Sequence, residues 1–340
     1  MSQAQQNDIG AAVRQVLGDS LGYLYPAAMR VAVSLGIADH LAEGAKSAEE
    51  LAELSKASAD HLRRVLRFLA TRGLFEEDAE GAFHLTTAGN LLRADSPLAM
   101  ASVVNLLTDE MYWLPAGRLD DTVRKGTTAF PDIFGSSLFD YLEQHQDSGQ
   151  TFHTALDDLS ATEHGPIVAN YEFPSGSTVV DVGGGQGGLL RAVLEANPEV
   201  TGVLFDRDVV VKGHRLDVPA LDGRWRIEGG SFFEAIPSGA DVYLLKRILH
   251  DWNDEDSVRI LRGCRNAMAE GGRVLVIDTV VPLGNDPHPA KLSDIAMMIV
   301  FDGKERTEAE LRALFAQADL RLERVIATPG SVSVVEAVAA

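Results

Sequence analysis

The feature that most constrains the fold is a glycine-rich loop that joins an apolar, β-branched run to a helical pattern. Residues 178–182, Thr-Val-Val-Asp-Val, are typical of a buried parallel strand. Five of the next six residues, 183–188, are glycine, so almost no side-chain bulk stands where the strand must turn. Leucine and valine then recur at helical spacing over 189–194. A strand, a glycine turn and a helix N-terminus in this order bring backbone N–H groups close to a ligand.

The glycine spacing leaves two classes of nucleoside ligand open. Gly183, Gly185 and Gly188 fit the spacing of dinucleotide-binding loops, whereas Gly183, Gly185 and Gly187 fit the tighter spacing of S-adenosylmethionine (SAM) enzymes. Asp181 stands two residues before the first glycine. A carboxylate there suits the ammonium group of SAM and would repel a pyrophosphate. We therefore predict S-adenosyl-L-methionine as the cofactor.

Strands and helices continue to alternate from residue 177 to the C-terminus. Asp206 follows an expected strand at 200–205 and lies 19 residues beyond Gly187, where a carboxylate can accept hydrogen bonds from both ribose hydroxyls. Further strands are expected at 226–233, 242–245 and 273–281, and a closing antiparallel pair at 320–327 and 331–337. This order predicts an α/β fold with a doubly wound, mainly parallel sheet that binds ligands at the carboxyl ends of its strands.

The N-terminal half reads as a separate, mainly helical domain, with a boundary that we place between residues 165 and 166. Residues 47–93 follow a helix, turn, helix and hairpin order, which is the outline of a winged helix. Over residues 58–93 five Lys or Arg are balanced by five Asp or Glu, so the segment lacks the basic surface of a DNA reader. We therefore expect a dimerisation domain and a homodimer, part of whose contact would come from helices that carry Leu35, Leu41, Leu62 and Leu66.

The charge and composition of the chain exclude several classes of partner. Its net charge of −20 repels nucleic acid and anionic membranes. Cys264 is the single cysteine, so no disulfide framework is expected. No apolar run approaches the length of a membrane span, and residues 1–10 lack the apolar core of a signal peptide, which predicts a cytoplasmic protein.

Candidate catalytic residues follow the expected strand at 242–245. Lys246 and His250 come directly after it, and histidine is the side chain best suited to accept a proton near neutral pH. Asp278, at the end of the next strand, and Glu305 are the acids that could orient His250. Such a base can deprotonate a phenol, whose oxygen then attacks a sulfonium methyl group in line, with no metal and no covalent enzyme intermediate. Residues 97–165 are rich in aromatic side chains, most of which we interpret as packing core and some as the wall of a pocket for a flat substrate.

Four ordered motifs, at 181–187, 230–233, 245–252 and 303–307, resemble those of SAM-dependent small-molecule O-methyltransferases. This is the plant caffeate and flavonoid type, which has many bacterial members that act on aromatic natural products. The resemblance covers nearly the whole chain. It implies a class I SAM methyltransferase fold with an N-terminal winged-helix dimerisation domain.

The resemblance also implies roles for individual residues. It assigns the cofactor to Asp181, Gly183, Gly185, Asp206, Ser231, Phe232 and Lys246, with Asp206 on the ribose and Phe232 against the adenine. It makes His250 the general base, flanked by Asp278 and Glu305. It matches the acceptor pocket or its edge to Trp113, Phe152, Leu156, Asp294, Met297 and Met298. Ser231 stands where many members have an acid, and Arg207-Asp208 replaces the usual Leu-Pro pair. Neither departure removes the cofactor site.

Together these observations predict an enzyme that transfers a methyl group from SAM to a phenolic or enolic hydroxyl of an aromatic metabolite in an antibiotic or pigment pathway. The alternatives are methylation of a heteroaromatic nitrogen, a relative that keeps SAM but performs different chemistry, and a winged-helix regulator that senses SAM. The paired acids around His250 favour O-methylation, because a nitrogen with a free lone pair needs no base. The acceptor and its methylated position are not specified by the sequence.

Overall fold

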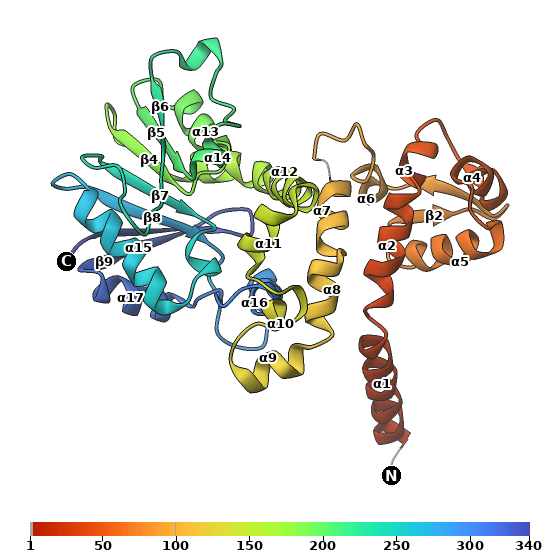
Figure 1. Ribbon diagram of the computed structural model, residues 1–340. Helices are drawn as coiled ribbons and strands as arrows, with labels where there is room; N and C mark the ends of the chain where they lie inside the picture. The colour runs from red at the N-terminus through yellow and green to blue at the C-terminus, as the bar shows by residue number, and fades with distance from the viewer. Residues whose placement is uncertain (1–2, 99) are drawn as a thin grey trace. The chain divides into compact units, whose positions relative to one another are not determined.

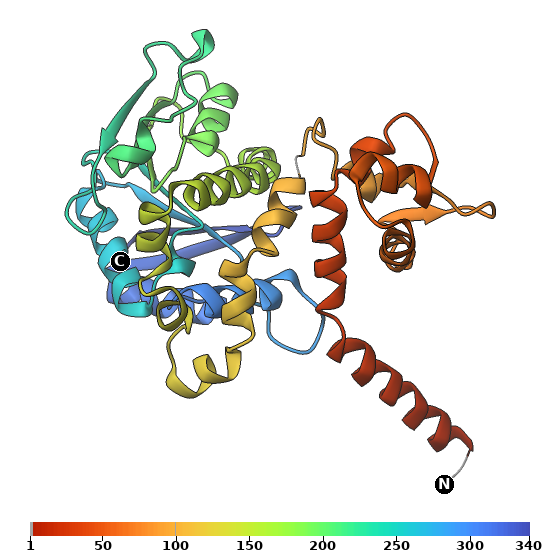
Figure 2. The ribbon, with the colours of Figure 1, turned by 45° about the vertical axis from the view of Figure 1, so that its right-hand side comes forward.

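The computed structural model describes residues 3–98 and 100–340, with side chains from Asp8 onward in the first helix. The chain forms two compact units (Figures 1 and 2). The first unit is Met1–Glu110 with Thr154–Asp158, and the second is Met111–His153 with Leu159–Ala340. Each unit has its own hydrophobic core and is described separately.

The second unit is built on a seven-stranded sheet with the order β6-β5-β4-β7-β8-β10-β9. Its strands are β4 (Thr178–Val182), β5 (Thr201–Asp206), β6 (Trp225–Gly229), β7 (Val242–Lys246), β8 (Arg273–Asp278), β9 (Leu320–Ala327) and β10 (Ser333–Ala339). The strands from β6 to β8 pair in parallel, and β10 pairs antiparallel with both β8 and β9. The doubly wound, mainly parallel sheet predicted from the sequence is thus confirmed. The strand order reverses between β4 and β7, which is where such sheets bind ligands.

The sheet has a hydrophobic core on each face because side chains alternate along every strand. Val180 and Val182 enter the core that contains Leu261 of α15 (Asp254–Ala267) and residues of α17 (Glu308–Gln317). Val179 enters the opposite core, with Leu190 of α13 (Gly188–Ala196). The strand expected at 273–281 ends at Asp278. The carboxylate of this residue therefore stands at the carboxyl end of the sheet.

The remaining helices of the second unit lie before the sheet or between its strands. They are α9 (Leu119–Lys125), α10 (Phe130–Phe134), α11 (Leu138–Gln144), α14 (Asp208–Val211) and α16 (Pro289–Val300); α8 (Glu110–Ala116) and α12 (Gln146–Asn170) each have residues in both units. Phe130, Phe134 and Tyr141 pack ring against ring, with centroids 4.5 to 5.9 Å apart, as expected for core aromatics. No helix in the described ranges has both the length and the apolar character needed to span a membrane.

The first unit is mainly helical around a three-stranded sheet of order β1-β3-β2. Its elements are α1 (Gln3–Ser20), α2 (Leu24–Ser34), α3 (Ile37–His40), β1 (Lys46–Ser47), α4 (Ala48–Ser55), α5 (Ala59–Ala70), β2 (Phe75–Glu77), β3 (Ala82–Leu85), α6 (Thr87–Asn90) and α7 (Met100–Leu107). The predicted capping box begins α4, where Ser47 and Glu50 hydrogen-bond each other's backbone N–H groups. The order α4, α5, hairpin agrees with the expected elements, and the winged-helix assignment stays a prediction.

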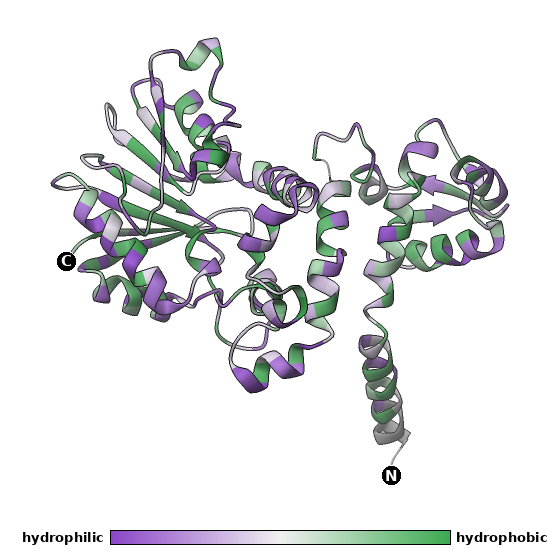
Figure 3. Cartoon of the chain, in the orientation of Figure 1, coloured by the Kyte–Doolittle hydropathy of each residue, from purple (hydrophilic) through white to green (hydrophobic). Residues whose placement is uncertain are grey.

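Three of the four leucines that we expected at the contact with a second copy are buried within the first unit itself, and Leu35 is partly buried. Leu41, Leu62 and Leu66 are at most 3% exposed and pack in the core of their own unit, so they are not free to contact a second copy. On α1, by contrast, Ile9, Val13, Val16 and Leu17 are 50 to 65% exposed. Figure 3 shows green, hydrophobic segments along this helix. The spacing of apolar residues in the sequence correctly indicated that Leu41, Leu62 and Leu66 are buried. A helical repeat of 3.6 residues, however, does not tell whether an apolar face packs within the chain or against a partner.

The close packing of α13 on β5 generates a prediction about stability. A Cβ atom at Gly202 would lie 2.8 Å from Leu190 Cδ1 and 3.1 Å from Leu190 Cγ, in a fully buried core. We expect Gly202→Ala to lower the free energy of unfolding by about 1–3 kcal/mol, because the core is overpacked. Gly165→Ala is the matched control, since a Cβ there meets no atom within 4 Å and alanine favours a helix. Urea denaturation of both variants measures the difference, and equal stability would contradict the packing of α13 on β5.

Candidate active site

The glycine loop after β4 has the geometry of a ligand cradle. Gly183, Gly185 and Gly187 have φ values of 69°, 60° and 83°, a left-handed region that other residues rarely adopt. A Cβ at Gly183 would lie 2.4 Å from Ile248 Cδ1, whereas one at Gly185 would meet nothing within 4 Å. The loop therefore requires glycine at Gly183 for both conformation and space, and it leaves open space beside Gly185.

Asp181, at the carboxyl end of β4, is a buried carboxylate with unused hydrogen-bonding capacity. It is 1% exposed, and its Oδ2 has no hydrogen-bond partner among the described residues. Burial raises its pKa to about 7, although the charge of Lys246 opposes the shift. Such a group is suited to a cationic ligand.

Asp206 ends β5, as the sequence predicts, and braces the glycine loop. Its Oδ2 accepts a hydrogen bond from the Gly185 N–H at 2.9 Å, and its Oδ1 accepts one from the Arg207 N–H at 2.7 Å. A carboxylate has about four acceptor positions, so both oxygens can also take ribose hydroxyls. Arg207, one of the two departures from the family pattern, forms an ion pair with Glu143 of α11.

Ser231 and Phe232 follow β6 and are partly buried. The Ser231 hydroxyl accepts a hydrogen bond from the Phe233 N–H at 3.3 Å, so it shapes its own turn. Phe232 packs edge-to-face on Phe233 and Trp252, with centroids 4.8 and 5.8 Å apart. Phe232 thus belongs to an aromatic cluster with Phe233 and Trp252.

Lys246 ends β7, and an acid that the sequence reasoning did not consider balances its charge. Its Nζ lies 2.9 Å from Glu163 Oε2 on α12 and also donates to the Ser160 hydroxyl. Both charged side chains are at most 7% exposed. Burial lowers the pKa of Lys246, and the charge of Glu163 opposes that shift.

His250 lies in a short 3-10 helix, Leu249–Asp251, which two residues separate from the end of β7, and three carboxylates act on it. It is 6% exposed; its Nδ1 is 3.0 Å from Glu305 Oε1 and its Nε2 is 3.4 Å from Asp251 Oδ1. Desolvation by burial lowers the pKa of His250, but the charges of Asp251 and Asp278 and the hydrogen bond to Glu305 together raise it to about 9. The structure thus brings the three predicted catalytic residues together and adds Asp251.

Glu305 is itself held by two residues of α16. Ser293 donates its hydroxyl hydrogen to Glu305 Oε1 at 2.6 Å, and Asp294 Oδ1 accepts a hydrogen bond from the Glu305 N–H at 3.0 Å. Asp294, which the resemblance places at the edge of the acceptor pocket, therefore also holds the backbone of the residue that is hydrogen-bonded to His250. The pKa of Asp294 is raised, mainly by burial.

Comparisons with known proteins agree with this site. A family model described as an O-methyltransferase domain matches residues 117–321, and one described as an O-methyltransferase dimerisation domain matches residues 19–95. Phenazine O-methyltransferase PhzM of Lysobacter antibioticus is 39% identical over 318 residues, which cover 93% of each chain. The chain belongs to the O-methyltransferase family.

Other relatives refine this membership. The crystal structure of CalO1, a methyltransferase in calicheamicin biosynthesis in its SAH-bound form, has a TM-score of 0.90 and 44% identity, with 100% of both chains covered. Phenazine-1-carboxylate N-methyltransferase of Pseudomonas aeruginosa is 31% identical over 94% of this chain and 95% of that protein. The protein is a SAM-dependent methyltransferase, O-methylation is the main activity of its relatives, and its dimerisation domain supports a homodimer.

The residues of this O-methyltransferase fit its methyl donor. The unpartnered Asp181 Oδ2 could accept a hydrogen bond from the ammonium group of the methionine part. Asp206 could hold the ribose, and Phe232 could stack on the adenine. Lys246, which pairs with Glu163, also favours the ionised form of Asp181 through its positive charge.

The residues that the resemblance matches to the acceptor pocket come from three helices. Trp113 on α8 and Met297 and Met298 on α16 are partly buried, and Phe152 on α12 is 3% exposed. Leu156, also on α12, is 37% exposed and belongs to the first unit. Their contact with an acceptor stays a prediction.

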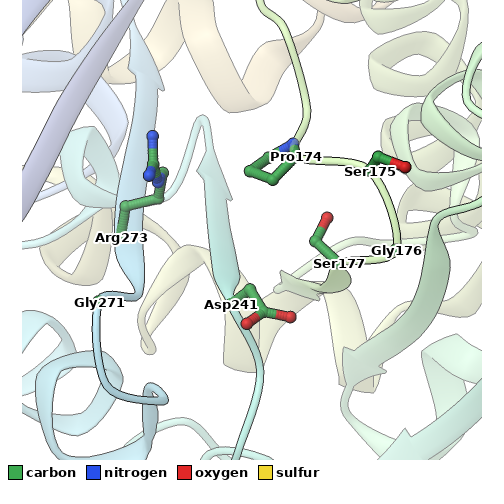
Figure 4. A pocket seen from close by; sticks show the side chains of 7 residues that line it. All are labelled: Pro174, Ser175, Gly176, Ser177, Asp241, Gly271 and Arg273. Atoms are coloured by element: carbon green, nitrogen blue, oxygen red, sulfur yellow. The ribbon is translucent and has the colours of Figure 1, made fainter.

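A cavity of about 220 Å³ lies at the opposite edge of the sheet (Figure 4). It is lined by Pro174, Ser175, Gly176, Ser177, Asp241, Gly271 and Arg273, which stand before or at the amino ends of β4, β7 and β8. Ligands of doubly wound sheets bind at the carboxyl ends. This cavity is therefore separate from the candidate site.

Asp251, Glu163 and Arg247 are charged residues to which sequence reasoning gave no role in the site. Asp251 could have been assigned from its place beside His250. Glu163 carries no such signal, since it precedes its partners Lys246 and Arg247 by more than 80 residues.

The position of Asp206 yields a prediction about cofactor affinity. Removing its carboxylate deletes the acceptor for the ribose hydroxyls and the brace on Gly185, so Asp206→Ala should weaken S-adenosylhomocysteine binding by about 1.5–3 kcal/mol. Exposed Asp222→Ala is the control. Calorimetry that found an unchanged affinity in Asp206→Ala, or tighter binding of NAD to the unmodified protein, would show that the loop is misassigned.

Proposed function

We propose that the enzyme methylates a phenolic or enolic hydroxyl of an aromatic metabolite, in an antibiotic or pigment pathway, with His250 as the general base. The observation that carries the proposal is the contact of His250 Nδ1 with Glu305 Oε1 at 3.0 Å, within a buried group of three carboxylates. A histidine held in this way has one ring nitrogen fixed as a donor. Its other nitrogen, Nε2, lies 3.4 Å from Asp251 Oδ1 and is the atom that would accept the proton.

In this mechanism the residues bind, orient and carry one proton. SAM supplies an electrophilic methyl group on a sulfonium sulfur. The acceptor hydroxyl gives its proton to His250 Nε2 while its oxygen forms the new O–CH3 bond and the S–CH3 bond breaks, which leaves S-adenosylhomocysteine as a neutral thioether. Asp251, Asp278 and Glu305 stabilise the imidazolium that forms, and water later takes its proton.

Methylation of a ring nitrogen is the second candidate, because a relative at 31% identity is named as a phenazine N-methyltransferase. A neutral ring nitrogen carries its own lone pair, so an N-methyltransferase gains little from a base. Three carboxylates around one histidine favour a reaction that removes a proton. O-methylation is therefore the function that the described site supports best.

Replacing the base tests this proposal directly. His250→Ala and His250→Gln should lower turnover by about 10²–10⁴-fold and leave S-adenosylhomocysteine binding nearly unchanged. The loss should shrink for an acceptor whose hydroxyl is more acidic, because such an acceptor binds already deprotonated. The exposed His61→Ala is the control. A folded His250→Ala enzyme with wild-type turnover on a weakly acidic phenol would rule out the base.

The raised pKa of His250 predicts a pH dependence. Only neutral imidazole can accept the proton. We therefore expect kcat/KM to rise as the pH increases toward the pKa of about 9, and to level off above it. Glu305→Gln removes a negative charge that favours the imidazolium, so it should lower the pKa of His250. The rising limb of the plot of kcat/KM against pH should then move to lower pH, and the maximal kcat/KM should fall. Glu308→Gln, an exposed acid paired with Arg312, should leave the limb in place. A limb that stayed at the same pH in Glu305→Gln would contradict the assigned electrostatic role.

A further inference from the structure

One turn of α12 presents three polar side chains toward the carboxyl end of the sheet. Ser160, Glu163 and His164 are spaced by three and four residues, so they share one face of the helix. Glu163 is 4% exposed, and an acid is almost never buried this deeply unless it is paired. None of the three has a role in the function proposed above.

Glu163 is held by four hydrogen bonds or ion pairs from two chain segments. Arg247 donates from Nη2 to Oε1 at 2.5 Å and from Nε to Oε2 at 3.1 Å, as a two-pronged fork. Ser331 donates to Oε1 at 3.0 Å, and Lys246 Nζ lies 2.9 Å from Oε2. Although burial alone raises the pKa of Glu163, these cations lower it to about 2, so the carboxylate is charged.

Arg247 occupies a turn on which the catalytic histidine depends. Its φ is 53°, a left-handed conformation that is unfavourable for a residue with a Cβ. Its N–H donates to the Ile277 carbonyl at 3.0 Å, and the fork on Glu163 holds its side chain. Ile248, which follows at once, packs against Gly183 of the cofactor loop, and His250 comes two residues later.

The same turn of α12 also contacts the end of the glycine loop, through His164. Ser160 Oγ is hydrogen-bonded to His164 Nε2 at 3.1 Å and to Lys246 Nζ. A Cβ at Gly188, the first residue of α13, would lie 2.6 Å from His164 Cε1. Burial and the charge of Lys246 lower the pKa of His164 to about 4, so the imidazole is a neutral packing group at neutral pH.

We propose that Glu163 is a positioning residue for methyl transfer: it holds Lys246 and Arg247, and thereby fixes both the turn that carries His250 and the contact of α12 with the glycine loop. This inference rests on the proposed role of His250 as the base. Glu163 touches neither the acceptor nor the methyl donor in this proposal. Its effect reaches the reaction through Arg247, and through Lys246, whose partner Ser160 is hydrogen-bonded to His164.

The experiment compares Glu163→Gln and Arg247→Lys with Glu195→Gln, an exposed acid that also pairs with an arginine, Arg191. Arg247→Lys keeps the positive charge but loses the fork, so it tests positioning even if Glu163→Gln fails to fold. Each variant is assayed with SAM and two acceptors: an aromatic hydroxyl compound that a methylation screen identifies, and its ring-nitrated analogue with a more acidic hydroxyl. S-adenosylhomocysteine affinity and melting temperature are measured in parallel.

We expect turnover on the less acidic acceptor to fall about 10–100-fold in both variants, a smaller loss on the nitrated acceptor, and weaker S-adenosylhomocysteine binding in Glu163→Gln. Glu195→Gln should match the wild type. Wild-type turnover, or an equal loss on both acceptors together with a lowered melting temperature, would overturn the positioning role.

A parallel His250→Ala series separates this inference from the proposed function. An acidity-dependent loss in His250→Ala that is missing from Glu163→Gln and Arg247→Lys would overturn only the role of Glu163. An equal loss on both acceptors in His250→Ala would rule out His250 as the general base. The positioning role of Glu163, which rests on it, would then also be ruled out.

Discussion

Parallel strands end at one edge of their sheet, and in this protein that edge collects buried or partly buried ionisable side chains from four strands. Asp206, Lys246 and Asp278 end β5, β7 and β8, and Asp181 is the last residue but one of β4. Desolvation disfavours the charged form of each buried group, and only neighbouring charges and hydrogen bonds can restore it. The pKa values of Asp181 and Asp278 both rise to about 7, so the edge of the sheet is poised to bind cations and exchange protons near neutrality.

Two groups of opposite charge share this edge and differ in function. In the first, the two cations of Lys246 and Arg247 share the single carboxylate of Glu163. In the second, three acids exceed the single cation of His250, which gives the imidazole a high proton affinity. A base of high proton affinity suits a weakly acidic hydroxyl, because it moves the proton-transfer equilibrium toward the phenolate. The same affinity leaves the imidazole mainly protonated at neutral pH, so rate and pH are coupled.

The sequence anticipated much of the site because its residues stand at positions that local rules define. Asp206 and Asp278 follow apolar strands, and His250 lies four residues beyond the end of β7. Asp294 shows the limit of this reasoning: a resemblance places it near the acceptor, and the structure also shows it holding the Glu305 backbone at 3.0 Å. The first unit shows a second limit, since Leu41, Leu62 and Leu66 fill its own core.

By itself, the sequence determined the alternation of strands and helices, the glycine turn and the acids at the strand ends. Those features depend on steric preferences and periodicities that act over a few residues. Only the tertiary structure decided that Glu163 meets Lys246 and Arg247, that Asp251 joins the acids around His250, and which apolar faces stay exposed. Glu163 and Arg247 are 84 residues apart, and their contact depends on the path of α12 over the sheet, which no local pattern encodes.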